Sequence, residues 1–398
     1  MNNQLGDKVL LICPSVGIWQ INGDYSFDRK FYDGLKLYES MWGGSLKVVM
    51  SLSSAPSPQF GMVTYDVINE TIELKVLKAN ELIGKDELYG VDVVMASADD
   101  HKQANLSRLS RVMGIRCVYV IEYTLKTRLQ IALLSKVSKL RKVKNIVWLL
   151  RQELKLRKAM KLSSSIQTNG VPAFKSYGNL TSTPLLYYDT RYTQDMLVKQ
   201  TDLDRRLSYL DTGNALRLGF SGRLIEIKGA NDLILLAEKL VKLKIKFSLN
   251  IFGAGEESLT MRQKINELGM QNIVILHGAV NYEKELVPYV KSALDLFVCC
   301  HKQGDPSCTY LETYACGVPV VGYANEAHAG ILDKIDVGWS VPVNDVEALA
   351  KLIASLDKNR EEIKLKANTA LMFAKNHTFE TTFESRVKHC QEQLEHAW

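Results

Sequence analysis

A chain of 398 residues, of which 46% are hydrophobic and 24% charged, can bury full hydrophobic cores and is too apolar to be disordered. Its seven cysteines form no Cys-x-x-Cys pair and no Cys/His spacing suited to a metal, so we expect free thiols in a reducing cytoplasm. The first residues are polar up to Lys8 and no apolar run has the length of a membrane span, so we expect neither a signal peptide nor a transmembrane helix.

The first half of the chain alternates apolar runs with helical stretches. We predict strands at residues 8–13, 46–52, 91–97, 116–121 and 164–168, and a helix at 25–41. Strands that alternate with helices are typical of a parallel sheet. The sequence therefore predicts an α/β domain in this half.

Residues 126–161 form a strongly basic segment. They hold twelve Lys or Arg against the single acid Glu153, a net charge of +11 in a chain whose total is +6, so the rest carries −5. Apolar residues interleave with the cations at helical spacing, as in a basic amphipathic helix. Such a face can lie on anionic lipid headgroups, or it can be a surface helix whose cations are simply solvated. Nucleic acid is disfavoured, because no aromatic platform accompanies the charges.

The second half repeats the alternation after a polar stretch. Residues 190–213 show no sustained strand and are predicted to be a linker. Strands are then predicted at 217–221, 246–252, 273–276, 295–299 and 318–321, with helices between them. We place an N-terminal domain at 1–200, a second domain at 201–378 and, at 379–398, a C-terminal helix that can cross back to the first domain.

The most informative stretch runs from Asp295 to Tyr323. An apolar strand leads into a polar turn with Gly and Pro, a short helix follows, Gly317 closes it, and a new strand begins. The helix start near Ser307, Cys308 and Thr309 leaves backbone N–H groups unpaired at a positive dipole end, which suits a phosphate. Glu312, about one turn along, offers a carboxylate to a sugar hydroxyl.

On these residues the chain resembles the retaining glycosyltransferases of family four, whose GT-B fold has two Rossmann-like domains that face each other across a cleft. The resemblance covers residues 216–356 and, more loosely, the N-terminal half. The family usually has two Glu separated by seven residues, whereas Gly304 stands eight positions before Glu312 here. Either the adjacent Asp305 takes the place of the first acid, or backbone groups make the sugar contact.

The resemblance also implies roles for residues that follow the other strands of the second domain. Arg223 and Lys228 would hold the donor diphosphate, and together with Glu312, Asp305 and Glu122 they are the catalytic candidates. The remaining donor-binding candidates are Gly222, Gly253, Gly255, Gly278, Ala279 and Gly304, with Ser307, Cys308 and Thr309 at the helix start. Taken alone, a surface Arg, a capping Lys and glycines in tight turns would explain these residues as well.

The N-terminal half is expected to supply the acceptor groove. Gly23 and Asp24 stand where the family has a Gly-rich turn that approaches the donor phosphate, between the first strand and the predicted helix. Asp99 and His101 follow a strand and are acceptor-side candidates, and Glu122 stands where many family members have His. Each of these polar residues could instead cap a helix or a turn.

The sequence predicts a metal-independent, retaining glycosyltransferase that needs no cofactor beyond its nucleotide-diphosphate sugar. The acceptor is expected to be a lipid-linked glycan, as for the bacterial capsule and O-antigen (lipopolysaccharide) enzymes that the chain resembles, with the protein in the cytoplasm or peripheral on the cytoplasmic face of the inner membrane. A non-catalytic sugar-nucleotide or membrane-binding scaffold is the alternative. A dinucleotide-dependent oxidoreductase is less favoured, because no GxGxxG follows the first strand.

Overall fold

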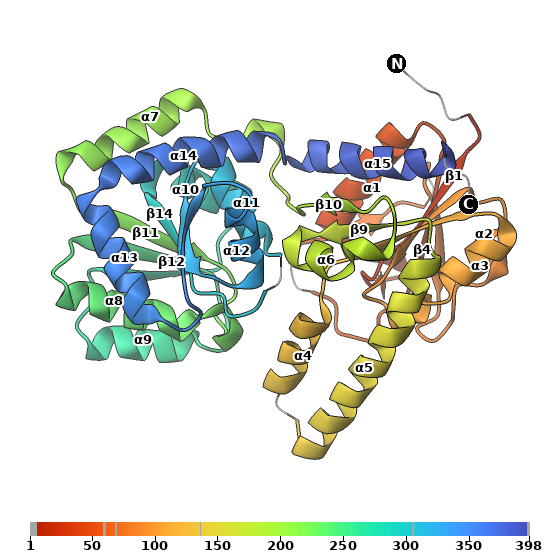
Figure 1. Cartoon of the computed structure of the whole chain (residues 1–398), viewed down its shortest axis with the longest axis horizontal. Helices are drawn as coiled ribbons and strands as arrows, with labels where there is room; N and C mark the ends of the chain where they lie inside the picture. The colour runs from red at the N-terminus through yellow and green to blue at the C-terminus, as the bar shows by residue number, and fades with distance from the viewer. Residues whose placement is uncertain (1–5, 59–60, 68–69, 136, 305, 396–398) are drawn as a thin grey trace. The chain divides into compact units, whose positions relative to one another are not determined.

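The computed structural model describes residues 6–58, 61–67, 70–135, 137–304 and 306–395. The chain divides into two compact units (Figure 1). Unit 1 runs to Tyr187 and resumes at Glu380, and unit 2 comprises Tyr188–Phe379. Each unit is built on its own parallel sheet.

The parallel sheet of unit 1 has the strand order β10-β9-β8-β7-β1-β4-β6. Its strands are β1 (Val9–Cys13), β4 (Ser45–Ser51), β6 (Glu73–Leu77), β7 (Val93–Ser97), β8 (Arg116–Ile121), β9 (Ser165–Asn169) and β10 (Leu185–Tyr187). The helices of this unit are α1 (Arg29–Trp42), α2 (Lys85–Leu88), α3 (Leu106–Met113), α4 (Leu125–Leu134), α5 (Lys139–Leu162), α6 (Gly170–Tyr177) and α15 (Phe379–Glu395). Leu11 and Val94 on one face of the sheet and Leu10 and Val93 on the other are all fully buried, which explains why these strands are continuous apolar runs in the sequence.

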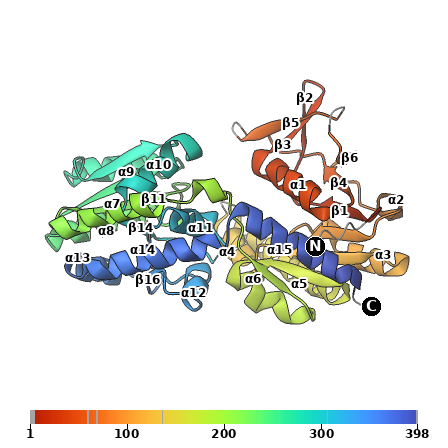
Figure 2. The same ribbon diagram turned by 90° about the horizontal axis from the view of Figure 1, so that it is seen from above.

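The prediction of a helix at residues 25–41 is correct only from Arg29 onward. Residues before it form a hairpin of β2 (Trp19–Ile21) and β3 (Asp24–Asp28), and β3 pairs with β5 (Met62–Tyr65) in an antiparallel sheet that lies beside α1 (Figure 2). Asn22 and Gly23 both have positive φ, as the tightest hairpin turns require. Helix α1 then begins after Asp28, whose side chain accepts a hydrogen bond from the Phe31 N–H.

The basic segment forms two helices rather than one. Thr124 caps α4 and Ser138 caps α5, and the two helices form a hairpin that extends away from the sheet of unit 1 (Figure 1). Among the described residues, no helix has both the length and the apolar character that a membrane span needs.

Helix α15 packs against unit 1. The Phe383 ring lies 4.9 Å from the Tyr38 ring and covers Gly34, where a side chain would leave it no room. Farther along the helix, His389 Nε2 lies 3.0 Å from the Ser165 hydroxyl and the Gln391 amide donates to the Trp42 carbonyl. The last helix of the chain is thus part of the unit that contains the first strand.

The sheet of unit 2 has the order β13-β12-β11-β14-β15-β16. Its strands are β11 (Leu216–Ser221), β12 (Phe247–Phe252), β13 (Val274–Gly278), β14 (Leu296–Cys299), β15 (Val320–Tyr323) and β16 (Gly338–Val341). Its helices are α7 (Gln200–Ser208), α8 (Ala230–Lys242), α9 (Ser258–Glu267), α10 (Val287–Ala293), α11 (Cys308–Ala315), α12 (Glu326–Leu332), α13 (Val346–Lys358) and α14 (Arg360–Lys375). All the strand pairs are parallel. Both faces of the sheet are buried, with Leu218, Ile251 and Val298 on one face and Phe297 and Val320 on the other.

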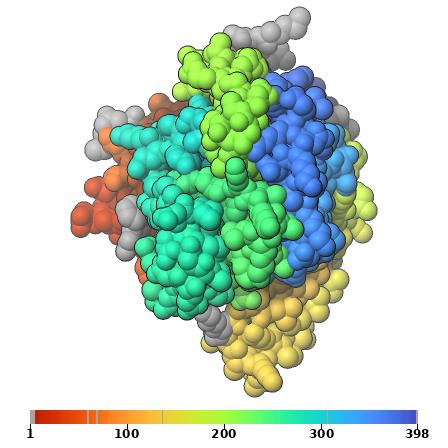
Figure 3. Space-filling model, turned by 90° about the vertical axis from the view of Figure 1, so that its left-hand side faces the viewer, coloured from red at the N-terminus to blue at the C-terminus, as the bar shows by residue number. Residues whose placement is uncertain are grey.

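The interpretation of residues 190–213 as a linker is wrong, because they include α7, which packs into unit 2. Buried Arg206 donates from Nη1 to the carbonyls of Lys291 and Cys316, at 3.0 and 2.7 Å. Gln200 on α7 bonds to Asn368 on α14, and Figure 3 shows the atoms of these two helices side by side. Arg206 thus makes specific contacts inside the unit, although other polar side chains of the segment, such as Arg205, face solvent.

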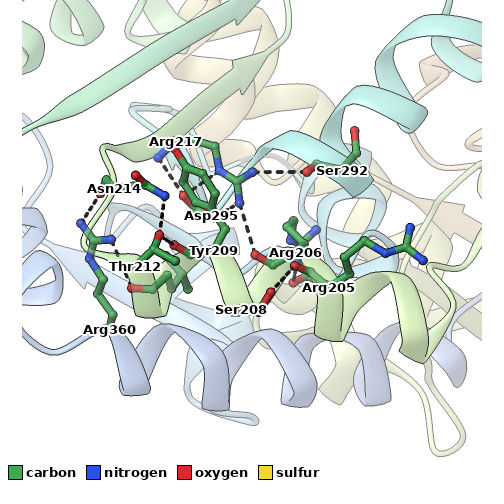
Figure 4. A network of polar contacts seen from close by, with 12 residues as sticks. Arg205, Arg206, Ser208, Tyr209, Thr212, Asn214, Arg217, Ser292, Asp295 and Arg360 are labelled. Carbon is green, nitrogen blue, oxygen red and sulfur yellow. Dashed lines mark hydrogen bonds and ion pairs between the residues drawn. The ribbon is translucent and has the colours of Figure 1, made fainter.

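An ion pair fixes the start of the unit 2 sheet next to this segment. Arg217 donates to both carboxylate oxygens of buried Asp295, at 2.6 and 3.1 Å, and its guanidinium stacks on the Tyr209 ring at 3.9 Å (Figure 4). The same carboxylate accepts the Arg217 backbone N–H. This network joins β11, the turn after α7 and the entry to β14.

Candidate functional site

The candidate site lies at the carboxyl ends of the unit 2 strands. β11 pairs with β12 on one side and β14 on the other, so the strand order reverses there, and ligands of doubly wound sheets bind at such a reversal. Three predicted glycines meet at this edge. The Gly253 N–H donates to the Gly278 carbonyl at 2.7 Å, and a Cβ on Gly253 would lie 1.9 Å from the Gly222 carbonyl oxygen. No larger residue fits at Gly253, so the glycines allow the three backbones to approach closely.

The turn that contains Arg223 is braced by the turn after β12. The Leu224 N–H donates to the Ala254 carbonyl, and the Leu224 carbonyl accepts the Glu257 N–H, both at 3.0 Å. A Cβ on Gly255 would lie 2.2 Å from the Leu224 oxygen, so this position also requires glycine. The Arg223 side chain remains exposed at this edge, which leaves its charge available to a ligand.

Lys228 lies beside the turn that follows β14. It ends a short helical turn, is buried, and is followed by Gly229 in the left-handed conformation. A Cβ on Gly229 would lie 2.1 Å from the Cys300 carbonyl oxygen, and the Lys302 N–H donates to the Ile227 carbonyl. These contacts bring Lys228 next to His301, 73 positions later in the chain.

His301 is a residue that the sequence did not single out as a site. It is buried between the Phe220 and Tyr310 rings, and neither ring nitrogen has a hydrogen-bond partner among the described residues. Burial, and then the positive charge of Lys228, lower the pKa of His301 far below its usual range, so the imidazole is neutral at pH 7. Buried polar groups are normally paired, so its nitrogens could bind water or a ligand.

The start of α11 keeps the form that the sequence predicts. Ser307 precedes the helix but makes no side-chain capping bond to the described backbone, and its hydroxyl lies 3.1 Å from that of Thr309. The Cys308 thiol lies 3.5 Å from the Asp189 carboxylate. The helix has two turns and ends before Gly317, whose φ of 64° is the left-handed conformation expected of a helix terminus.

Glu312 is buried and paired with an arginine that the sequence did not indicate. Arg191 donates from Nε and Nη2 to the two carboxylate oxygens, at 2.8 and 3.5 Å. Its guanidinium also stacks on the Tyr282 ring at 3.8 Å. Arg191 stands in a segment without strand or helix periodicity, so no sequence pattern could have linked it to Glu312.

A different acid lies against the position of the missing motif glutamate. A Cβ on Gly304 would lie 2.9 Å from Glu326 Cβ and 3.0 Å from Glu326 Oε2. Asn325 holds this segment in place, because its amide donates to the His301 carbonyl and to the Tyr310 hydroxyl. Asp305, the predicted substitute, lies outside the described residues.

In unit 1, Asp99 and Glu122 come together, although through the Glu122 backbone. The Asp99 carboxylate accepts the N–H groups of Glu122 and Tyr123, at 2.8 and 3.2 Å. Burial raises the pKa of Asp99 to about 6, against the opposing effect of these two bonds. Asp99 therefore braces the turn before α4, as a capping residue would.

The remaining candidates of unit 1 do not join Asp99 and Glu122. His101 is exposed, and its ring meets the Trp148 ring edge-on at 5.2 Å. Gly23 lies in the exposed turn of the β2–β3 hairpin, and exposed Asp24 is the first residue of β3. The expectation that these two residues lead directly into a helix N-terminus is wrong, because β3 intervenes.

The ionisable groups do not form a metal centre in the part of the chain that the structure describes, where no three His, Cys, Asp or Glu side chains gather as ligands. The charged groups at the edge of unit 2 include the cations Arg223 and Lys228, the Arg191–Glu312 pair and Glu326. Such a set can bind a phosphorylated ligand through charge-assisted hydrogen bonds.

Comparison with protein families matches residues 210–371, most of unit 2, to the model of "Glycosyl transferases group 1". These residues therefore form a glycosyltransferase group 1 domain. A curated relative, the 2-deoxystreptamine N-acetyl-D-glucosaminyltransferase of Streptomyces fradiae, is 26% identical over 136 residues. That match spans 34% of this chain and about a third, 32%, of the relative.

Solved structures resemble nearly the whole chain. The UDP complex of Anabaena Alr3699/HepE has a TM-score of 0.64 at 14% identity, covering 97% of this chain and 99% of that one. The lipopolysaccharide outer core galactosyltransferase WaaB has a TM-score of 0.62 at 10% identity, with 97% and 99% covered. These likenesses confirm the predicted fold class, an α/β protein with the two Rossmann-like domains of GT-B.

Proposed function

We propose that the protein is a retaining glycosyltransferase that moves a sugar from a nucleotide-diphosphate donor to a hydroxyl group of a glycan. The observation that carries this proposal is the edge of unit 2, where Arg223, Lys228 and the start of α11 lie in the segment that matches the glycosyltransferase family. The glycines at this edge let the turns after the strands pack closely together, and we propose that their backbone groups contact the nucleotide.

In the proposed reaction, the bond between the anomeric carbon and the diphosphate oxygen breaks and the acceptor oxygen bonds to that carbon on the same face. The acceptor proton passes to the departing phosphate. Arg223 and Lys228 stabilise the negative charge that develops on the diphosphate, the α11 N-terminus adds its N–H groups, and Glu312 holds the nucleotide ribose. Two cations beside a helix terminus can do this without a metal ion, so activity should persist in a chelator.

For the donor we propose a nucleotide-diphosphate sugar and do not specify its nucleobase. The structures similar to this chain include the Anabaena protein solved with UDP and with UDP-glucose, which makes uridine the first base to test. For the acceptor we propose a lipid-linked glycan of bacterial surface polysaccharide synthesis. The likeness to a lipopolysaccharide core galactosyltransferase supports that choice, and the basic segment fits work at the cytoplasmic face of the membrane.

The experiment is a thermal-shift screen of the protein with UDP-, GDP- and dTDP-sugars, followed by an assay of donor hydrolysis and transfer. A donor that binds the folded state raises the melting temperature by mass action. Lys228→Ala and Glu312→Ala should each lower turnover by about 100-fold, because each removes a group that we propose binds the donor. The matched controls Lys242→Ala and Glu347→Ala change an exposed cation and an exposed acid of the same unit and should leave turnover unchanged. A protein that neither binds nor turns over any of these sugars would refute the proposal.

A non-catalytic scaffold is the second candidate, favoured by the glycine that replaces the first acid of the family motif. A scaffold would bind a nucleotide sugar in the thermal-shift screen and show no hydrolysis or transfer by the wild-type chain. The two measurements therefore separate the two functions.

A further inference from the structure

Helix α5 exposes a stripe of aliphatic side chains along one face. The stripe consists of Leu140, Val143, Val147, Leu150 and Leu154, whose exposed fractions lie between 42% and 71%. Spacings of three and four residues place them on one side of a helix with 3.6 residues per turn, over a length of about 21 Å. We call this set the α5 stripe.

The other side of α5 explains why the stripe is left uncovered. Leu156, Ala159 and Met160 are buried in the core of unit 1, so the stripe points away from the domain to which the helix is attached. Helix α4 adds three more exposed side chains at the same hairpin, namely Ile131, Leu133 and Leu134. Soluble surfaces rarely collect so many large apolar side chains, and such patches usually mark an interaction site.

Glu153, the one acid in residues 126–161, is already paired at the base of the hairpin. Buried Glu153 accepts hydrogen bonds from Arg128 at 2.8 Å, Arg157 at 2.7 Å and the Tyr177 hydroxyl at 3.2 Å. The cations farther out have no acid of the segment to pair with. Lys144, Arg151 and Lys155 each directly follow a residue of the α5 stripe, so they line one flank of it, and all three are exposed.

An aliphatic stripe flanked by cations restricts what can cover it. A second copy of the chain would bring another segment of net charge +11 against the first, which like-charge repulsion opposes. A nucleic acid would suit the cations but not the five aliphatic side chains, which offer its bases no ring to stack on. An anionic lipid surface meets both features, because acyl chains cover the stripe while headgroup phosphates pair with the flanking cations.

We propose that the α4–α5 hairpin is a membrane-docking element, in which α5 lies along an anionic bilayer surface with the α5 stripe in the headgroup region. This inference rests on and deepens the proposed function, which places the basic segment at a membrane, because it assigns the surface of unit 1 that docks. Docking itself requires no donor. Its consequence is that the chain binds a bilayer through one helix that lies on the surface.

The experiment is vesicle flotation of the full chain, with vesicles of phosphatidylcholine alone or mixed with phosphatidylglycerol. The wild type should float with the mixed vesicles, remain behind with phosphatidylcholine, and be released by high salt. The triple variant Val143→Gln, Val147→Gln, Leu150→Gln removes the middle of the stripe, and Lys144→Gln, Arg151→Gln, Lys155→Gln removes the flanking charge. Each should lower the bound fraction by about tenfold.

Matched variants of unit 2 control for loss of apolar or positive surface in general. Leu259→Gln, Leu365→Gln and Met372→Gln change three exposed apolar residues, and Lys244→Gln, Lys246→Gln and Arg262→Gln change three exposed cations. Both controls should float like the wild type, and far-ultraviolet circular dichroism with thermal melting verifies that all variants fold.

Several results would overturn the proposal. They are equal recovery of the wild type with both kinds of vesicle, unchanged flotation of the stripe variant, or a wild-type dimer in sedimentation that the stripe variant converts to monomer. Because vesicle binding needs neither donor nor acceptor, its failure is a separate result from a failure of glycosyl transfer.

Discussion

Arg191 and Glu312 form an ion pair in which the buried carboxylate is met by a guanidinium that rests on the Tyr282 ring. The pair links a residue that precedes α7 to the middle of α11. It fixes the orientation of the one motif acid that this chain retains.

Arg191→Met should destabilise the fold, because it leaves the buried Glu312 carboxylate without its cation. We expect the free energy of unfolding to fall by about 2 kcal/mol. Arg191→Lys should give a smaller loss, since it keeps the charge but not the flat surface that stacks on Tyr282. Urea denaturation measures both changes, and an Arg191→Met protein as stable as the wild type would show that the pair contributes nothing.

Asp99 should make stability fall with rising pH. Its folded-state pKa of about 6 lies above the ordinary 3.8, so the folded chain binds this proton more tightly than the unfolded chain. The contribution is fully present below about 3.8 and is lost as the pH rises through about 6. Urea denaturation of the wild type and of Asp99→Asn across this range measures the effect. As the pH rises, the free energy of unfolding of the wild type should fall relative to that of the variant. A difference that stays constant with pH would contradict this assignment.

Arg206→Met should be among the more costly substitutions in unit 2. The buried guanidinium donates hydrogen bonds to the carbonyls of Lys291 and Cys316, and its removal leaves these carbonyls unpaired away from water. We expect a loss of about 3 kcal/mol in the free energy of unfolding. The neighbouring Arg205→Met is the control, because that side chain is 79% exposed and its contact with Asp202 should contribute little. Equal effects of the two substitutions would argue against a specific role for Arg206.

Gly304 and Glu326 should be energetically coupled. A Cβ at position 304 would approach Glu326 Cβ to 2.9 Å, so Gly304→Ala forces the two segments apart. We expect this substitution to cost about 1–3 kcal/mol in the wild type and much less in a Glu326→Gly background. Chemical denaturation of the wild type, the two single variants and the double variant completes this double-mutant cycle. Additive effects of the two substitutions on the free energy of unfolding would mean that the contact does not constrain position 304.

The strands were predictable because parallel strands are covered on both faces and need continuous apolar runs. The central strands β1, β7, β11 and β12 all occur where the sequence predicts them. The short edge strands β10 and β16 and the hairpin β2–β3 were missed, since a few half-exposed residues carry no comparable pattern. Residues 190–213 were misread for a related reason. Arg206 of this segment binds buried carbonyls whereas Arg205 is solvated, and a sequence does not distinguish two such arginines.

By itself, the sequence determined the two α/β units, the start of α11 and the concentration of positive charge in one segment, because local patterns of apolar, glycine and charged residues encode them. Only the tertiary structure decided which side chains meet. It paired Glu312 with Arg191, brought Glu326 against Gly304, buried His301 beside Lys228 and turned the aliphatic side of α5 outward. These contacts join residues that stand far apart in the chain or, on α5, depend on what the rest of the unit covers, so their geometry arises only when the sheets and helices pack.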